Sequence, residues 1–157
     1  LTFIHLSDTH ITSDGAAFNG IDPMAHLRAF VAQVNTFLQR PDFVLHTGDI
    51  SNDRGADSYR RAQAALADLA VPLYVVNGNH DDRALMRAML GAPAGPGGDP
   101  AAPLDYTFEV RDERFLVLDA ASTHVRAPLG HLSEAQLALA RAEATPDGPP
   151  PSTTMSA

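Results

Sequence analysis

The chain has 157 residues and no cysteine, and its 19 Asp and Glu residues outnumber its 11 Lys and Arg residues, which gives a formal net charge of −8 at pH 7. This length predicts one domain with a substantial core, and the lack of cysteine excludes disulfides and thiolate metal sites. The acidic balance disfavours a nonspecific nucleic-acid partner, because such a surface repels the phosphate backbone. With so few Lys and Arg residues, a bound metal ion is the expected source of positive charge for binding any phosphate ligand.

No apolar run reaches the ~18 residues that a membrane-spanning helix needs, and no signal peptide is visible. We therefore expect a cytoplasmic protein without a membrane partner. A leader removed before Leu1 is the alternative, because the chain opens directly on an apolar strand pattern.

Strand and helix patterns alternate through the first half of the chain. Strands are expected over residues 1–7, 42–47 and 71–77, and helices over 22–41 and 59–70. In the first helix, Asp22 is the expected N-cap and Pro23 the first helical residue. Its expected apolar stripe consists of Leu27, Phe30, Val31, Val34, Phe37 and Leu38. This alternation predicts an α/β fold built on a parallel sheet.

The second half of the chain is predicted to be less regular. The expected elements are a helix over 83–90, a hairpin of 104–110 with 114–120, and a helix over 132–144. Ser133 and Gln136 form a capping box at the start of the last helix. The Gly/Pro/Ala-rich residues 91–103 predict a flexible loop, and residues 146–157 predict a disordered tail after a domain that covers 1–145.

Each of the three expected parallel strands ends in a polar cluster. The clusters are Asp8-Thr9-His10, Gly48-Asp49 and Gly78-Asn79-His80-Asp81. Because the carboxyl ends of parallel strands meet at one edge of a sheet, we expect the three clusters to converge. Glycine at positions 48 and 78 is expected to let the backbone turn sharply there.

The side chains in these clusters suit a pair of divalent ions. Asp8 and His10 can aim at one ion, Asp49 can bridge two ions, and the side-chain oxygen of Asn79 can reach the second. Two ions ~3.5–4 Å apart would stabilise both the attacking oxygen and the leaving oxygen when a phosphoryl group is displaced in line. Taken singly, each residue also has a structural explanation, since Asp-x-His is common by chance, Asp49 could cap a loop and Asn79 could form a turn. The joint placement at three successive strand ends favours the metal site.

In this order, the segments "HLSDTH", "HTGDIS" and "NGNHDD" resemble the signature of the calcineurin-like metallophosphoesterase superfamily, and the similarity covers residues 2 to about 145. "GNHDDR" and "LGHLSEAQLALARA" are most similar to the class III cyclic-nucleotide phosphodiesterases and glycerophosphodiesterases. Phosphoprotein phosphatases would have Arg where Asn77 stands. Mre11/SbcD-type nucleases are a further alternative, which the acidic balance disfavours.

The resemblance implies a four-layer α/β/β/α sandwich and hydrolysis of a small phosphodiester, such as a 3',5'-cyclic nucleotide, by a hydroxide that bridges two metal ions. By resemblance, Asp8 and His10 bind the first metal, Asp49 bridges, and Asn79 binds the second. The catalytic residues would be His80, which contacts the phosphate, and Asp81, which orients His80. The implied metals are Mn, Fe or Zn.

The resemblance breaks after the helix over 132–144. Relatives continue with further strands and with histidine motifs that supply three more metal ligands, and this chain has neither. We therefore expect a sandwich that is incomplete at its C-terminus, with apolar faces that favour aggregation or a homo-oligomer. The alternative to an enzyme is an inactive truncated fragment, or a metal-binding module that needs a partner chain.

The remaining polar residues near these motifs have structural explanations. Packed or surface positions are expected for His5, His26, His46, His124 and His131, of which His46 and His124 are closest to the expected site. Asp53 and Asp82 are expected to cap loops or to support the ligands from behind.

Overall fold

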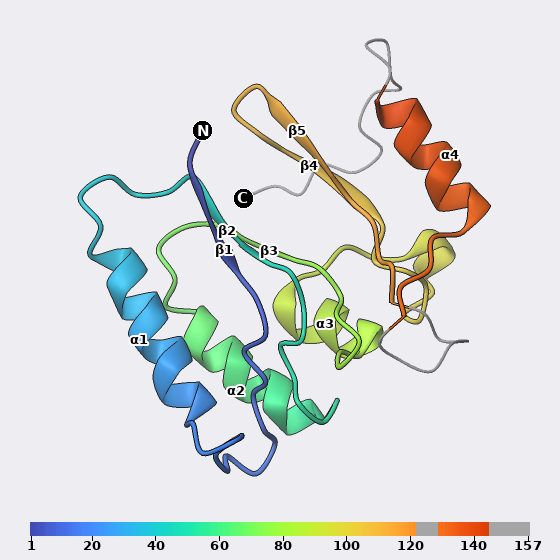
Figure 1. The fold of residues 1–157 in the computed structure, drawn as a ribbon. Coiled ribbons are helices and arrows are strands. Elements are labelled where there is room, and N and C mark those ends of the chain that lie inside the picture. Colours follow the sequence, from blue (N-terminus) through green and yellow to red (C-terminus); the bar gives the residue numbers. More distant parts are fainter. Residues whose placement is uncertain (122–128, 145–157) are drawn as a thin grey trace.

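The computed structural model describes residues 1–121 and 129–144 (Figure 1). The predictions for His124 and for the tail over 146–157 lie outside the described residues. Among the described residues, no helix is long and apolar enough to cross a membrane.

Three parallel strands form the central sheet, in the order β1 (Phe3–Leu6), β2 (Phe43–His46), β3 (Leu73–Val75). Leu6 lies opposite His46, which in turn lies opposite Val75. The carboxyl ends of the strands are therefore level, and the three loops that follow them leave from the same edge. This confirms the parallel sheet and explains why the polar clusters meet.

Three helices cover one face of this sheet: α1 (Pro23–Asn35), α2 (Ala56–Leu66) and α3 (Arg83–Leu90). They share one apolar core with β3, in which Leu27, Tyr59 and Met86 are buried. The strand order follows the chain order, so right-handed crossovers place both connecting helices on the same face.

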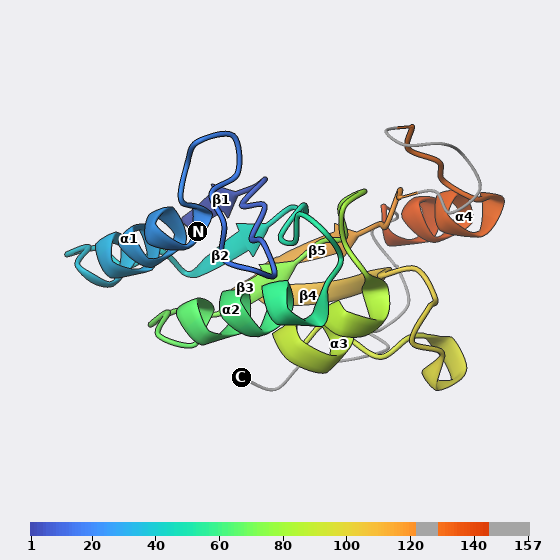
Figure 2. The ribbon, with the colours of Figure 1, turned by 90° about the horizontal axis from the view of Figure 1, so that it is seen from below.

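The other face of the sheet packs against a hairpin of β4 (Tyr106–Val110) and β5 (Glu113–Val117). Phe43 of β2 meets Phe108 of β4 and Phe115 of β5 in a second apolar core. The last helix, α4 (Glu134–Glu143), is joined to the hairpin by an ion pair between Arg114 and Glu143. Figure 2 shows α1 at one end of the molecule and α4 at the opposite end, with the strands between them. The mixed α/β fold class is thus confirmed.

The predicted caps are confirmed, but α1 is shorter than predicted. Asp22 accepts a hydrogen bond from the backbone of Ala25, and Ser133 and Gln136 form the capping box of α4. Helix α1 ends at Asn35, because the hydroxyl and backbone N–H of Thr36 both donate to the carbonyl oxygen of Gln33. The predicted apolar stripe therefore loses its last two members, Phe37 and Leu38, which are exposed.

The segment over 91–103 has more structure than the predicted flexible loop. It contains a short 3-10 helix, Pro96–Gly98. The guanidinium of Arg87 donates hydrogen bonds to the carbonyl oxygens of Pro93, Pro100 and Pro103. A single α3 side chain thus holds the loop at three points, a contact that composition does not reveal.

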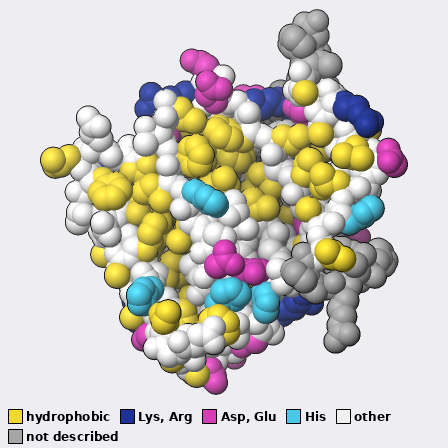
Figure 3. Space-filling view, in the orientation of Figure 1, with side chains coloured by type: hydrophobic (Ala, Val, Ile, Leu, Met, Phe, Trp, Pro, Cys, Tyr) yellow, Lys and Arg dark blue, Asp and Glu magenta, His cyan; other side chains and the backbone are white. Residues whose placement is uncertain are grey.

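One face of the molecule has exposed apolar side chains near β1. Leu1 is 48% exposed and Phe3 is 41% exposed, although the Phe3 ring stacks on Phe43 with centroids 4.9 Å apart. Figure 3 shows hydrophobic atoms gathered over the strands on this face. The predicted homo-oligomer stays a prediction.

Candidate metal centre

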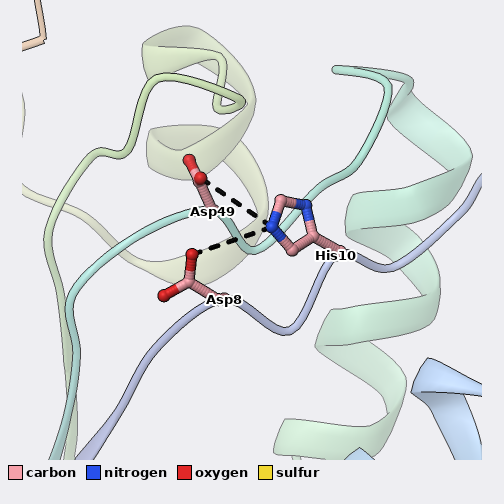
Figure 4. A group of neighbouring side chains, drawn as sticks. All are labelled: Asp8, His10 and Asp49. Atoms are coloured by element: carbon pink, nitrogen blue, oxygen red, sulfur yellow. Dashed lines mark ion pairs between the residues drawn. The ribbon is translucent and has the colours of Figure 1, made fainter. Parts of the chain in front are cut away.

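Three of the four predicted metal ligands meet at the carboxyl edge of the sheet. Asp8 and His10 lie on the loop after β1, and Asp49 lies on the loop after β2. One ligand atom from each lies within 4.8 Å of the others. The Nε2 atom of His10 lies 3.7 Å from Oδ1 of Asp8 and 3.9 Å from Oδ2 of Asp49, pointing between the two carboxylates (Figure 4). We call these residues the Asp8–His10–Asp49 cluster.

The donor set and spacing of this cluster fit a divalent cation. Two carboxylates and an imidazole suit Mn, Fe or Zn. Separations of 3.7 and 3.9 Å are too long for hydrogen bonds, but two ligands that each lie ~2.1 Å from one ion stand ~3–4 Å apart. These observations are what a site built for an ion predicts.

All three members of the cluster have left-handed backbone conformations. The φ angles of Asp8, His10 and Asp49 are 56°, 45° and 54°. This region is uncommon for residues other than glycine, and such conformations cluster at functional sites. The strain is balanced by hydrogen bonds between the loops, in which the backbone N–H of Asp8 donates to Gly48 and that of His10 donates to Asp49.

A glycine at position 8 should therefore stabilise the metal-free fold relative to alanine. Asp8 is largely exposed, so the two variants differ mainly in the strain of the left-handed backbone. We expect the free energy of unfolding of Asp8→Gly to exceed that of Asp8→Ala by about 1 kcal/mol in urea titrations without metal. The control is Asp68, which is exposed and has no positive φ. There, Asp68→Ala should have a higher free energy of unfolding than Asp68→Gly. If Asp8→Gly were the less stable of its pair, the backbone would not be strained.

The loop after β3 fixes the orientation of Asp49. The backbone N–H of His80 donates to Oδ1 of Asp49 at 2.9 Å, which leaves Oδ2 directed toward His10. The backbone of Gly78 lies so close to this carboxylate that a Cβ atom at position 78 would stand 2.2 Å from Oδ1 of Asp49. The φ of Gly78 is not positive, so close approach, rather than the predicted sharp turn, requires this glycine; Gly48 does have a positive φ, of 101°.

Behind the cluster, the fully buried His46 joins the first two loops. The backbone N–H of Gly48 donates to Nδ1 of His46 at 3.3 Å, so the ring proton is on Nε2 and donates to the Thr9 hydroxyl at 3.0 Å. That hydroxyl donates in turn to the carbonyl oxygen of Ile50. These hydrogen bonds fix the position of Thr9, which lies between Asp8 and His10 in the chain, relative to the loop that carries Asp49.

Protonation of His46 should weaken the fold in mild acid. Burial, the main cause, lowers the pKa of His46 from 6.5 to about 4. Between pH 6.5 and about pH 4, His46 therefore binds a proton in the unfolded chain but not in the folded chain. The free energy of unfolding is highest above pH 6.5 and decreases as the pH is lowered through this range. From pH 7 to pH 5 we expect urea titrations to show a loss of about 2 kcal/mol.

The matched variants for this test are His46→Gln and His131→Gln, since His131 is exposed. His46→Gln should lack the component of about 2 kcal/mol, whereas His131→Gln should keep it. An equal pH dependence in both variants would show that His46 is not responsible.

Asp81 makes hydrogen bonds other than the predicted one. It is buried, and its carboxylate accepts hydrogen bonds from the backbone N–H groups of Ile50, Ser51 and Gly78 and from the hydroxyl of Tyr59. Burial raises its pKa, and these hydrogen bonds oppose that rise. Among the described residues, no hydrogen bond joins Asp81 to the imidazole of His80, whose Nδ1 lies 3.1 Å from the carbonyl oxygen of Asn52 instead. Asp81 holds the second and third loops together against α2.

His80 lies next to the cluster. Its ring centroid is 5.1 Å from that of His10. Its Nδ1 lies 3.1 Å from the carbonyl oxygen of Asn52, which can only accept, so Nδ1 carries a proton and Nε2 is the remaining reactive atom. Asn79 precedes His80 on the same loop. The backbone carbonyl oxygen of Asn79 accepts a hydrogen bond from the guanidinium of Arg54. Metal binding by Asn79 stays a prediction.

Asp53 and Asp82 are caps, one of the two roles expected for them. Asp53 accepts hydrogen bonds from the backbone and hydroxyl of Ser13 and from the backbone of Gly55, which ties the first loop to the second. Asp82 caps α3 by accepting from the backbone of Leu85.

Sequence reasoning misses several residues around the site. The Phe18 ring stacks on His10, with centroids 4.9 Å apart, and an aromatic residue inside a polar loop is the available signal. Tyr59 fits an apolar helix face by its spacing, and its hydroxyl contact with Asp81 has no sequence signal. Arg54 brings a cation to the third loop, and only its nearness to Asp49 in sequence hints at this.

Comparison with known proteins gives a consistent result. Residues 1–136 match the family described as calcineurin-like phosphoesterase. A 3',5'-cyclic adenosine monophosphate phosphodiesterase, CpdA, of Pseudomonas aeruginosa is 37% identical over 88% of this chain and 47% of its own length. A glycerophosphodiester phosphodiesterase, GpdQ, of Enterobacter lignolyticus is 36% identical over 74% of this chain and 42% of its own.

A third relative is a cAMP/cGMP dual specificity phosphodiesterase of Mycobacterium tuberculosis, 34% identical over 75% of this chain and 37% of its own length. The chain thus spans about half, or less, of the length of the curated relatives it matches.

Proposed function

Because the chain belongs to the calcineurin-like phosphoesterase family, we propose that it is a metal-dependent phosphodiesterase that hydrolyses small phosphodiesters, with 3',5'-cyclic nucleotides as the favoured substrates. The observation that carries the proposal is the Asp8–His10–Asp49 cluster, with the imidazole of His80 beside it. Two of the three relatives described above are named for cyclic-nucleotide substrates and one for glycerophosphodiesters.

The cluster would hold divalent metal in two positions. Asp8 and His10 would bind one ion, Asn79 would bind a second, and Asp49 would contact both, with Mn, Fe or Zn as the ions. When bound, such ions neutralise phosphate charge and lower the pKa of water. With a net charge of −8, the chain has to overcome its own repulsion of an anionic substrate, and ions at this position would do so.

His80 would act on the leaving group. Its Nδ1–H is held by the carbonyl oxygen of Asn52, which leaves Nε2 free, and its ring lies next to that of His10. In its protonated form, Nε2 would hydrogen-bond a phosphate oxygen and pass a proton to the departing alkoxide. Asp81 would act indirectly, by holding the loop that carries Asp49 and the loop that carries His80 in fixed positions relative to each other.

The test is Mn(II)-dependent hydrolysis of bis(p-nitrophenyl) phosphate and of 3',5'-cyclic AMP by the purified chain. Asp49→Ala should lower kcat/KM by roughly 100-fold or more, because it removes the residue shared between the ion positions. The exposed Asp68→Ala is the matched control and should keep wild-type turnover. A folded wild-type chain without Mn(II)-dependent turnover would refute the proposal and favour a module that acts with another chain.

A further inference from the structure

A pocket of about 480 Å³ lies beside the Asp8–His10–Asp49 cluster, between the loop after β1 and the first half of α1. Asp8 and His10 line one side of it, so the pocket is continuous with the candidate metal centre. Its volume falls within the ~300–1,000 Å³ of typical small-molecule sites. A substrate whose phosphate is held at the cluster could therefore place an attached group in this pocket.

The walls of the pocket are largely apolar. Six apolar side chains line it: Leu6, Phe18, Ile21, Pro23, Leu27 and Phe30. Leu27 is buried in the core, but Ile21 is 54% exposed. Covering such a side chain with an apolar ligand surface is favourable, because it removes that surface from water.

A tight turn holds two of these wall residues in place. The backbone groups of Phe18 and Ile21 exchange hydrogen bonds of 2.8 and 3.0 Å across it. The central residues, Asn19 and Gly20, both have positive φ, 51° and 81°, which is the pattern of a type I′ turn. The Phe18 ring is fixed further by stacking on His10. The apolar wall is thus formed before any ligand binds.

The polar groups of the pocket suit an uncharged ligand with a polar edge. Asn19 and His26 line it and offer hydrogen-bonding atoms to solvent. No Lys or Arg is among the described residues that line it, so a second phosphate or an anionic headgroup would lack a counter-charge. A glycerol group, in turn, has no apolar face with which to cover Phe18 and Ile21.

We infer that this pocket holds the nucleobase of a nucleoside phosphodiester while the phosphate lies at the cluster. A base has apolar faces for the walls and a polar edge for Asn19 and His26. The inference rests on the proposed function, and it selects nucleoside diesters over glycerol diesters, the two substrate classes in the relatives' names.

The kinetic test compares 3',5'-cyclic AMP with glycerophosphoethanolamine, a diester without a base. The ratio of the KM for cyclic AMP to the KM for glycerophosphoethanolamine should rise about tenfold in Ile21→Ser, because the base loses its apolar wall. The matched control is Leu38→Ser, which removes a fully exposed apolar side chain outside the pocket and should change the ratio less than twofold. An unchanged ratio in Ile21→Ser would overturn the inference.

A binding test separates this inference from the proposed function. Adenosine has the base but no phosphate, so saturation-transfer NMR without metal should detect its binding to wild type and Leu38→Ser, with at least a fivefold weaker signal for Ile21→Ser. This result would support the pocket even if the chain showed no turnover. Adenosine that fails to bind, or binds equally to all three proteins, would overturn the inference.

Discussion

Gly78→Ala is expected to lower the free energy of unfolding by about 3 kcal/mol and to abolish Mn(II)-dependent turnover. A Cβ atom at this position would lie 2.2 Å from Oδ1 and 2.3 Å from the backbone nitrogen of Asp49. The first accepts a hydrogen bond from the backbone of His80 and the second is a backbone atom, so neither can move without displacing the loop after β2. The variant should therefore damage stability and the site together.

The matched control for Gly78→Ala is Gly91→Ala. Gly91 has a positive φ of 71°, but a Cβ atom there would meet nothing within 4 Å. Its substitution should lower the free energy of unfolding by only about 1 kcal/mol and leave turnover at the wild-type level. Urea titrations and Mn(II)-dependent hydrolysis measure both effects. If the two variants behaved alike, close approach to Asp49 would not explain Gly78.

Asp81→Ala should lower stability more than loss of any other carboxylate on the three loops after β1, β2 and β3. The substitution leaves three backbone N–H groups and the hydroxyl of Tyr59 without their acceptor in a buried site. Buried unsatisfied donors each cost about 1–3 kcal/mol, and we expect a total loss of about 4 kcal/mol after relaxation.

The neighbouring Asp82→Ala separates this network from a simple helix cap. Asp82 accepts from the backbone of Leu85 at the start of α3, so its loss should lower the free energy of unfolding by about 1 kcal/mol. Urea titration of the two variants gives the comparison. A cost for Asp81→Ala no greater than for Asp82→Ala would mean that the four hydrogen bonds do not hold the loops together.

The convergence of the site can be predicted because it follows from topology. Strand-end clusters at Asp8, Asp49 and His80 lie together once the strands are parallel and level, and the alternation of strand and helix patterns along the chain predicts the parallel arrangement. Helix caps such as Asp22 and Ser133 are predictable for a similar reason, since they depend on residues three positions away.

Contacts between distant residues are not predictable in this way. Sequence reasoning pairs Asp81 with its neighbour His80, but three of the four hydrogen-bond donors to Asp81 come from the loop after β2 and from α2, up to 31 residues away. The role of Gly78 depends on how closely Asp49 approaches, which periodicity does not encode. The end of α1 at Asn35 depends on the Thr36 hydroxyl, which competes with continuation of the helix.

The central claim is that Asp8, His10 and Asp49 bind divalent metal together, and a Mn(II) titration followed by electron paramagnetic resonance tests it most directly. The wild-type chain should bind Mn(II), and His10→Ala and Asp49→Ala should each weaken binding at least tenfold, whereas the exposed His131→Gln should bind as wild type. Equal Mn(II) affinity in all four folded proteins would contradict the account, because the cluster would then be an arrangement of side chains without a metal.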